Sequence, residues 1–134
     1  MTHVFADTFY YLALLDETDQ FHDEAVALTL DGRWSVVTTS WVLVELANAL
    51  AAPLNRRVFC QFEKALRSRT DVTVVPPRRD VFDAWLSLYR NRPDKEWSLT
   101  DCISFVVMQH QGIADALTGD HHFRQAGFNA LFSA

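Results

Sequence analysis

The stretch ALTGDHHF at residues 116–123 sets the strongest limit on how this chain can fold. It reads as a short buried strand, a glycine turn, and an acidic residue at the start of a new helix. A strand that passes within a few residues into a helix is typical of α/β folds. Asp120 therefore lies at a strand-to-helix junction, next to the two histidines His121 and His122.

Three other acidic residues occupy similar places in the sequence. Asp7 follows the apolar run at 4–6, Glu45 lies within the apolar run at 41–49, and Asp101 opens a very apolar segment. A carboxylate in apolar surroundings is costly unless a positive group compensates it. We therefore expect Asp7, Glu45, Asp101 and Asp120 to have a specific partner.

Strands alternate with helices along the chain. Apolar and β-branched runs predict strands at 4–6, 34–38, 72–75, 116–118 and 129–132. Helical patterns bounded by caps, glycine or proline predict helices at 8–15, from 19 or 20 to 32, 41–51, from 55 through 66, from 79 or 80 through 89, 99–111 and 121–125. This alternation predicts an α/β fold: a mostly parallel sheet of about five strands with helices on both faces. We expect a single domain over residues 1–134.

Composition narrows the class of protein. The chain has 134 residues, of which 49% are hydrophobic, enough to fill one core. No apolar run approaches the ~20 residues of a membrane helix, and the N-terminus lacks the features of a signal peptide. Cys60 and Cys102 are too few for a disulfide framework or a zinc cluster. We therefore expect a cytoplasmic protein with free thiols and no membrane partner.

Charge is unevenly distributed along the sequence. The net charge is −5, yet ten of the twelve basic residues lie between residues 55 and 95. Such asymmetry indicates a polyanion or a charged protein as partner, or simply solvated helix faces. The sequence is compatible with both interpretations.

The predicted topology is compatible with one pocket for the four acids. Ligands of parallel α/β sheets bind beyond the carboxyl ends of the strands. Asp7 directly follows the first predicted strand, and Asp120 comes two residues after the fourth. Glu45 and Asp101 lie in the first two turns of their helices, and the helix of Glu45 closely follows the second strand.

Each acid also has a structural alternative. Asp7 and Asp120 are suited to cap the helices that follow them, and Asp101 fits a capping box with Ser98. Glu45 has the weakest alternative, because its helix is apolar nearly all round and contains no lysine or arginine. Singly, each aspartate is better explained as a cap; together, the four acids favour a metal site.

Four clustered carboxylates repel one another unless a cation binds between them. Oxygen-only ligands suit Mg²⁺ or Mn²⁺, which polarise phosphoryl oxygens and activate water. Thr8 and Thr118 could support the carboxylates or that water, or could be buried hydroxyls bonded to the backbone. His121 and His122 are better explained as surface or capping residues, and at most one of them readily reaches the site, because neighbouring helical residues face different directions.

These residues together resemble the PIN-domain ribonucleases, and among them the small stand-alone toxins of the VapC type. The matching pieces are FADT at 5–8, VEL at 44–46, SLTDC at 98–102 and ALTGDHHF at 116–123, and the resemblance covers essentially the whole chain. It implies a three-layer PIN fold, often dimeric, and Mg²⁺- or Mn²⁺-dependent endonucleolytic cleavage of RNA. By the same resemblance the catalytic and metal-binding residues are Asp7, Glu45, Asp101 and Asp120, and Thr118 is the hydroxyl before the last acid. It also implies a cognate antitoxin protein.

The leading hypothesis is therefore a metal-dependent endoribonuclease, with RNA phosphates bound by Arg56, Arg57, Arg90 and Arg92. Trp97 would stack on a base or close the core. A protein-docking module is the alternative from another class, motivated by large apolar residues on the helices (Trp41, Phe59, Phe62 and Trp85). An RNA-processing nuclease without an antitoxin is another. A small phosphatase ranks last, because no lysine lies near Asp7, Asp101 or Asp120.

Overall fold

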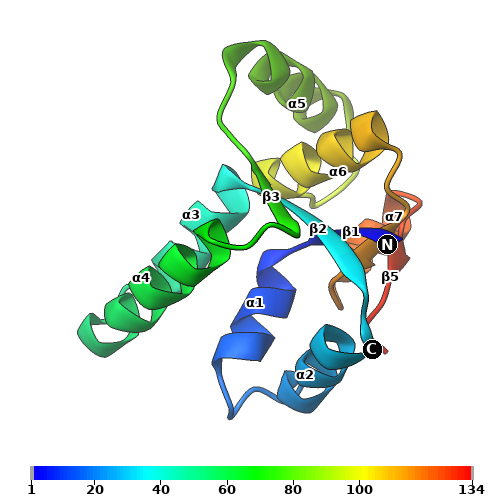
Figure 1. The fold of residues 1–134 in the computed structure, drawn as a ribbon. Helices are drawn as coiled ribbons and strands as arrows, with labels where there is room; N and C mark the ends of the chain where they lie inside the picture. The colour runs from blue at the N-terminus through cyan, green and yellow to red at the C-terminus, as the bar shows by residue number, and fades with distance from the viewer. Residues whose placement is uncertain (1, 134) are drawn as a thin grey trace.

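Five parallel strands form one sheet in the computed structural model, in the order β3-β2-β1-β4-β5 (Figure 1). The structure describes residues 2–133, apart from the side chain of Asp80. The strands are β1 (Thr2–Ala6), β2 (Trp34–Thr39), β3 (Val72–Val75), β4 (Asp115–Leu117) and β5 (Asn129–Ala130). All four strand pairs are parallel, so the predicted α/β class is confirmed.

Helices cover both faces of this sheet and make it the middle of three layers. Figure 1 shows α1 and α2 on one face and α5 and α6 on the other, while α3 and α4 lie side by side as a hairpin that projects from the sheet. The bounds are α1 (Thr8–Leu15), α2 (His22–Asp31), α3 (Ser40–Ala49), α4 (Pro53–Arg67), α5 (Arg79–Asn91), α6 (Leu99–Gln111) and α7 (His121–Gln125). None of these helices is long and apolar enough to cross a membrane.

The core is built around β1 and α6. Val4, Phe5 and Ala6 of the central strand are fully buried, and every residue from 102 to 108 of α6 is buried. Strands covered on both faces read as continuous apolar runs, which is what this strand shows. Asp7, which follows β1, and Asp101, in the first turn of α6, therefore adjoin the most buried parts of the fold.

The order of the strands places a crevice between β1 and β4. From β1 the chain moves outward to β2 and β3, then returns to β4 on the other side of β1 and continues to β5. Ligands bind at such a switch point, because the loops that follow the two strands diverge there. Ala6 pairs with Leu117, so Asp7 and Thr118 emerge side by side at this edge.

Several predicted boundaries are off by a few residues, for local reasons. Helix α4 begins at Pro53 and not at residue 55. Proline suits a first turn because the backbone N–H groups there have no partner within the helix, and proline lacks that N–H. Helix α2 begins only at His22, because the Asp19 carboxylate accepts a hydrogen bond from the Phe21 N–H (2.8 Å) and holds a turn before it. The fourth strand ends at Leu117, because the Thr118 N–H turns back to the Ala116 carbonyl (3.0 Å). Helix α3 ends at Ala49 and strand β5 at Ala130.

The large aromatic residues on the helices belong mainly to the core. Trp85 is fully buried, and Trp41 packs edge-on against it at 4.4 Å between ring centroids. Trp97 is only 7% exposed, and its indole N–H donates to Gln125 Oε1 (3.0 Å). Trp97 therefore closes the core, and these tryptophans lend no support to a docking module. Phe59 and Phe62 are half-buried against the same core.

Candidate active site

Asp7 is the most enclosed carboxylate of the candidate site. It follows β1 directly and is 5% exposed. It occupies the N-cap position of α1, but its side chain makes no capping hydrogen bond there. Instead, its Oδ2 accepts a hydrogen bond from Thr118 Oγ1 (2.8 Å). The hydrogen bond expected of a cap is therefore missing, and the Asp7 carboxylate is oriented by Thr118, which directly follows β4.

Thr118 links Asp7 to Asp120. Its fully buried hydroxyl donates to Asp7 and accepts from the Asp120 N–H (3.0 Å). The Asp120 carboxylate accepts from the His122 N–H (2.9 Å), so Asp120 also caps α7. Glycine lies between them, where the Phe9 ring approaches the backbone closely: a Cβ on Gly119 would lie 2.5 Å from Phe9 Cζ, so a larger residue would displace that ring.

Asp101 is held by the predicted capping box. The Asp101 N–H donates to Ser98 Oγ (3.0 Å), and the Ser98 N–H donates to Asp101 Oδ2 (3.2 Å). The box fixes the carboxylate in the first turn of α6. Capping and membership of a polar site are therefore compatible at this residue.

The structure brings the four predicted acids to one pocket of about 350 Å³. Five carboxylates line it, since Glu96 joins the four, and none of the lining residues is a lysine or arginine. Glu45 is half-buried and makes no hydrogen bond or ion pair within the part of the chain that the structure describes. The full lining consists of Asp7, Thr8, Phe9, Leu12, Glu45, Ala49, Glu96, Ser98, Asp101, Asp120 and His122.

The electrostatics of this pocket favour a compensating cation. Burial raises the pKa of Asp7 to about 7; the hydrogen bond from Thr118 opposes that rise, while the charges of Asp101 and Glu45 add to it. Burial also raises the pKa of Asp101, and the nearby Asp120 charge raises it further. A proton or a metal ion would relieve this repulsion.

One oxygen of each aspartate is fixed by the protein and the other is left open. Asp7 and Asp101 use Oδ2, and Asp120 uses Oδ1, for the contacts described above and for those to His122. The second oxygen of each has no side-chain donor among residues 2–133. The Thr8 hydroxyl, which belongs to the same pocket, is buried without a hydrogen-bond partner. Such a set of free, hard oxygen donors fits a divalent cation of the Mg²⁺ type.

His122 lies in the pocket although sequence reasoning favoured a surface or capping role. Its Nδ1 is 3.2 Å from Asp101 Oδ2 and 3.3 Å from Asp120 Oδ1. The side chain of His121 is 69% exposed, and its Nδ1 is 3.7 Å from Asp120 Oδ1. Both histidines thus lie within ion-pair distance of Asp120, so the expectation that at most one of them readily reaches the site is wrong, although only His122 lines the pocket. The sequence offered one indication of this role, the position of His122 two residues after Asp120.

The predicted arginines lie outside the acidic pocket. Arg90 and Arg92 line a second pocket of about 680 Å³, which we call the basic pocket and which also contains Lys95. The two pockets share Glu96 and Ser98, so they are adjacent. The Arg92 guanidinium lies 5.1 Å from the centroid of the Trp97 ring.

Arg56 and Arg57 are farther along the chain, on the exposed start of α4. Arg56 Nε donates to the Ala51 carbonyl (2.6 Å), so it also fastens the turn between α3 and α4.

Asp7→Asn should stabilise the metal-free protein above about pH 7. The pKa of Asp7 is about 7 in the folded chain against an ordinary 3.8, so folding favours the protonated form. The free energy of unfolding should therefore fall as pH rises from ~4 to ~7. The total loss is roughly 4 kcal/mol once Asp7 is ionised in both the folded and the unfolded chain. Asparagine cannot ionise, so the free energy of unfolding of Asp7→Asn should not show this fall with pH. Urea unfolding in EDTA at about pH 5 and about pH 8 measures the difference.

Asp83→Asn is the matched control for this measurement, because Asp83 is exposed on α5 and outside the pocket. An equal loss of stability with pH in the wild type and in Asp7→Asn would contradict the prediction.

Comparison with known proteins identifies the family. Residues 4–129 match the PIN domain family. The 23S rRNA-specific endonuclease VapC20 of Mycobacterium tuberculosis is 32% identical over 126 residues, covering 93% of this chain and 95% of the relative. The crystal structure of VapC20, described as a sarcin–ricin loop cleaving toxin, superposes with a TM-score of 0.85 at 29% identity, again over 93% and 95% of the two chains.

A more distant solved structure shares the fold alone. FitAcB from Neisseria gonorrhoeae superposes with a TM-score of 0.65 at 18% identity, over 97% of this chain and 96% of the other. The resemblance drawn from the motifs is thus confirmed by both sequence and structure. This chain belongs to the PIN domain family.

Proposed function

We propose that this protein is a divalent-metal-dependent endoribonuclease that hydrolyses phosphodiester bonds of RNA. The observation that carries the proposal is the pocket in which four acidic residues meet without a lysine or arginine. Asp7, Glu45, Asp101 and Asp120 would hold the ion, which is Mg²⁺, with Mn²⁺ as a substitute. The similarity to VapC20 over nearly the whole of both chains supports the same activity.

The protein residues would orient the ion and the attacking water. When bound, the ion polarises a phosphoryl oxygen and makes water a better nucleophile. Thr118 fixes Asp7, and the Ser98 capping box fixes Asp101, so two ligands are held in place before binding. Glu45 and the Thr8 hydroxyl, which have no partner among the described residues, are available to accept from or donate to the water.

The chain would act as a toxin on ribosomal RNA in the cytoplasm. VapC20 is named for 23S rRNA and described as cleaving the sarcin–ricin loop. The similarity covers 93% of this chain, so a structured RNA loop of that kind is the substrate we propose. A toxin needs restraint in its own cell, and we propose a cognate antitoxin protein as one partner.

Purified protein should cut a labelled sarcin–ricin loop RNA in Mg²⁺ or Mn²⁺, and EDTA should abolish the cleavage. Asp7→Asn and Asp101→Asn should each lower kcat by at least ~100-fold, because each removes a charged ligand of the ion. Asp83→Asn, outside the pocket, should cleave like the wild type. Gel-resolved cleavage rates test all three variants together.

Cleavage that survives both substitutions or EDTA would contradict the metal site. Cleavage of unrelated RNA loops at the same rate would instead favour an RNA-processing nuclease of broad specificity. Absence of cleavage with any RNA would move support to the protein-docking alternative.

RNA would approach the ion over the basic pocket. Arg90 lies in the last turn of α5, and Arg92 and Lys95 lie on the segment that joins α5 to α6. Their pocket adjoins the carboxylates through Glu96 and Ser98. Phosphate contacts by such side chains position a strand without reading its sequence. Arg56 and Arg57 would contact a more distant part of the RNA from the α3–α4 hairpin.

Charge reversal at Arg90 should weaken RNA binding more than charge reversal at Arg57. Arg90→Glu places a negative charge in the basic pocket, where the RNA strand would pass, whereas Arg57 is exposed on α4 and outside both pockets. We expect the dissociation constant for RNA to rise about tenfold for Arg90→Glu at low salt, and the difference to shrink as salt increases. Filter binding at two salt concentrations measures it. Equal affinities for the two variants would contradict this path for the RNA.

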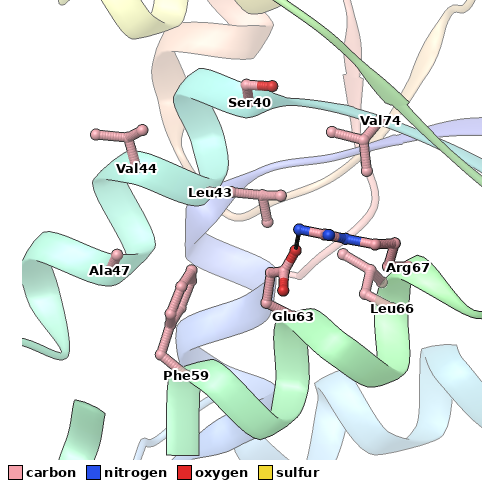
Figure 2. Close-up of a pocket in the computed structure, with 9 residues that line it drawn as sticks. All are labelled: Ser40, Leu43, Val44, Ala47, Phe59, Glu63, Leu66, Arg67 and Val74. Atoms are coloured by element: carbon pink, nitrogen blue, oxygen red, sulfur yellow. Dashed lines mark hydrogen bonds and ion pairs between the residues drawn. The ribbon is translucent and has the colours of Figure 1, made fainter.

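The second protein partner would be another copy of this chain, docked on the α3–α4 hairpin. Exposed aliphatic residues gather there: Val44 is 58% exposed, Leu54 87% and Val58 39%. An apolar groove of about 430 Å³ runs beside them. Figure 2 shows Leu43, Phe59 and Val74 turned into this groove, next to the Glu63–Arg67 ion pair. Exposed apolar surface of this kind marks a protein interface.

Val44→Glu should convert a dimer into monomers, because it places a charge in the proposed interface while leaving the monomer core unchanged. Analytical ultracentrifugation measures the masses at micromolar concentration. Leu30→Glu is the control, since Leu30 is 78% exposed on α2. A monomeric wild type, or a Val44→Glu protein that stays dimeric, would contradict the proposed interface.

A further inference from the structure

We propose that His122 is a positioning residue, which fixes the Asp101 and Asp120 carboxylates relative to each other for the metal ion. The inference rests on the proposed function, because it gives His122 a role in the same site. His122 is not one of the four acids proposed to bind the ion. Its role is inferred from the contacts that it makes with two of them.

His122 contacts both carboxylates through its ring and one of them through its backbone. The backbone N–H of His122 donates to Asp120 Oδ1 at 2.9 Å. Its Nδ1 lies 3.2 Å from Asp101 Oδ2 and 3.3 Å from Asp120 Oδ1. Carboxylates only accept hydrogen bonds, so the tautomer with the proton on Nδ1 fits this position. The ring N–H then donates to Asp101, while Asp120 accepts from the backbone N–H and lies within ion-pair distance of the ring.

No other side chain among residues 2–133 joins these two acids. Asp101 is fixed within α6 by Ser98, and Asp120 is fixed at the start of α7 by Thr118 and the His122 backbone. Each of these contacts stays within its own segment or reaches Asp7. The imidazole is the contact that spans α6 and α7 between two like charges.

The contact is shielded from water, which strengthens it. The side chains of His122 and Asp101 are 18% and 13% exposed. Hydrogen bonds to charged groups are stronger in such surroundings than at an open surface. His121, by contrast, is 69% exposed and makes no hydrogen bond to the acids among the described residues, so it provides a natural control.

The geometry leaves the ion's ligands free. His122 engages Asp101 Oδ2 and Asp120 Oδ1, while the other oxygen of each carboxylate has no side-chain donor among residues 2–133. Residues that orient metal-binding carboxylates in this way usually change metal affinity or activity by ~10–100-fold when removed. His122 therefore acts on the ion through the two acids and is not itself a ligand.

The test is Mn²⁺ binding to the metal-free full chain, measured by isothermal titration calorimetry with His122→Ala, His122→Asn and His121→Ala. The dissociation constant should rise ~10–100-fold in His122→Ala. His122→Asn should stay within a few-fold of the wild type, because its amide N–H lies close to where Nδ1 was. His121→Ala should bind like the wild type. Urea unfolding in EDTA checks that each variant is folded.

Unchanged Mn²⁺ affinity in His122→Ala would overturn the inference while leaving the nuclease proposal intact. A folded His122→Asn that binds as weakly as His122→Ala would also overturn it, because the imidazole would then be a ligand of the ion. A wild type that binds no Mn²⁺ would overturn both this inference and the proposed function.

Discussion

The hydrogen bond from Thr118 to Asp7 connects the fold to the chemistry. It is 2.8 Å long, buried, and joins residues at the ends of the two central strands β1 and β4. Between these two strands the order in which the chain adds strands to the sheet reverses. The bond therefore spans the place where such sheets bind ligands. It also holds the carboxylate whose burial is costliest, at the point where a cation would compensate it.

Much of the fold could be predicted from the sequence, because the local signals for caps, turns and strands agree with the alternation of strands and helices along the chain. The apolar run before Asp7, the Ser98 capping box and Gly112, which adopts a left-handed φ of 66° after α6, each mark one boundary. The four acids could be grouped because a carboxylate in an apolar run lacks a local explanation, as Glu45 shows most clearly. Asp101 proved to be a cap and a pocket residue at once, so the two interpretations were never exclusive.

The parts that sequence reasoning missed depend on contacts between distant segments. His122 reaches Asp101 across 21 residues of sequence, and no spacing rule indicates that contact. The burial of Trp97 depends on Gln125, and the adjacency of the basic pocket depends on how α5 joins α6. The helix predicted through residue 89 extends to Asn91, so Arg90 lies in the last turn of α5 and the helix sets its direction.

We propose that the four carboxylates form one cation site at the carboxyl ends of β1 and β4. Anomalous diffraction from crystals soaked in Mn²⁺ tests it most directly, because the signal places the ion without reference to activity. We expect an anomalous peak within coordination distance of Asp7 and Asp101, in contact with Glu45 and Asp120 or bridged to them by water. A peak outside this pocket, or ordered Mn²⁺-soaked crystals with no peak in it, would contradict the claim.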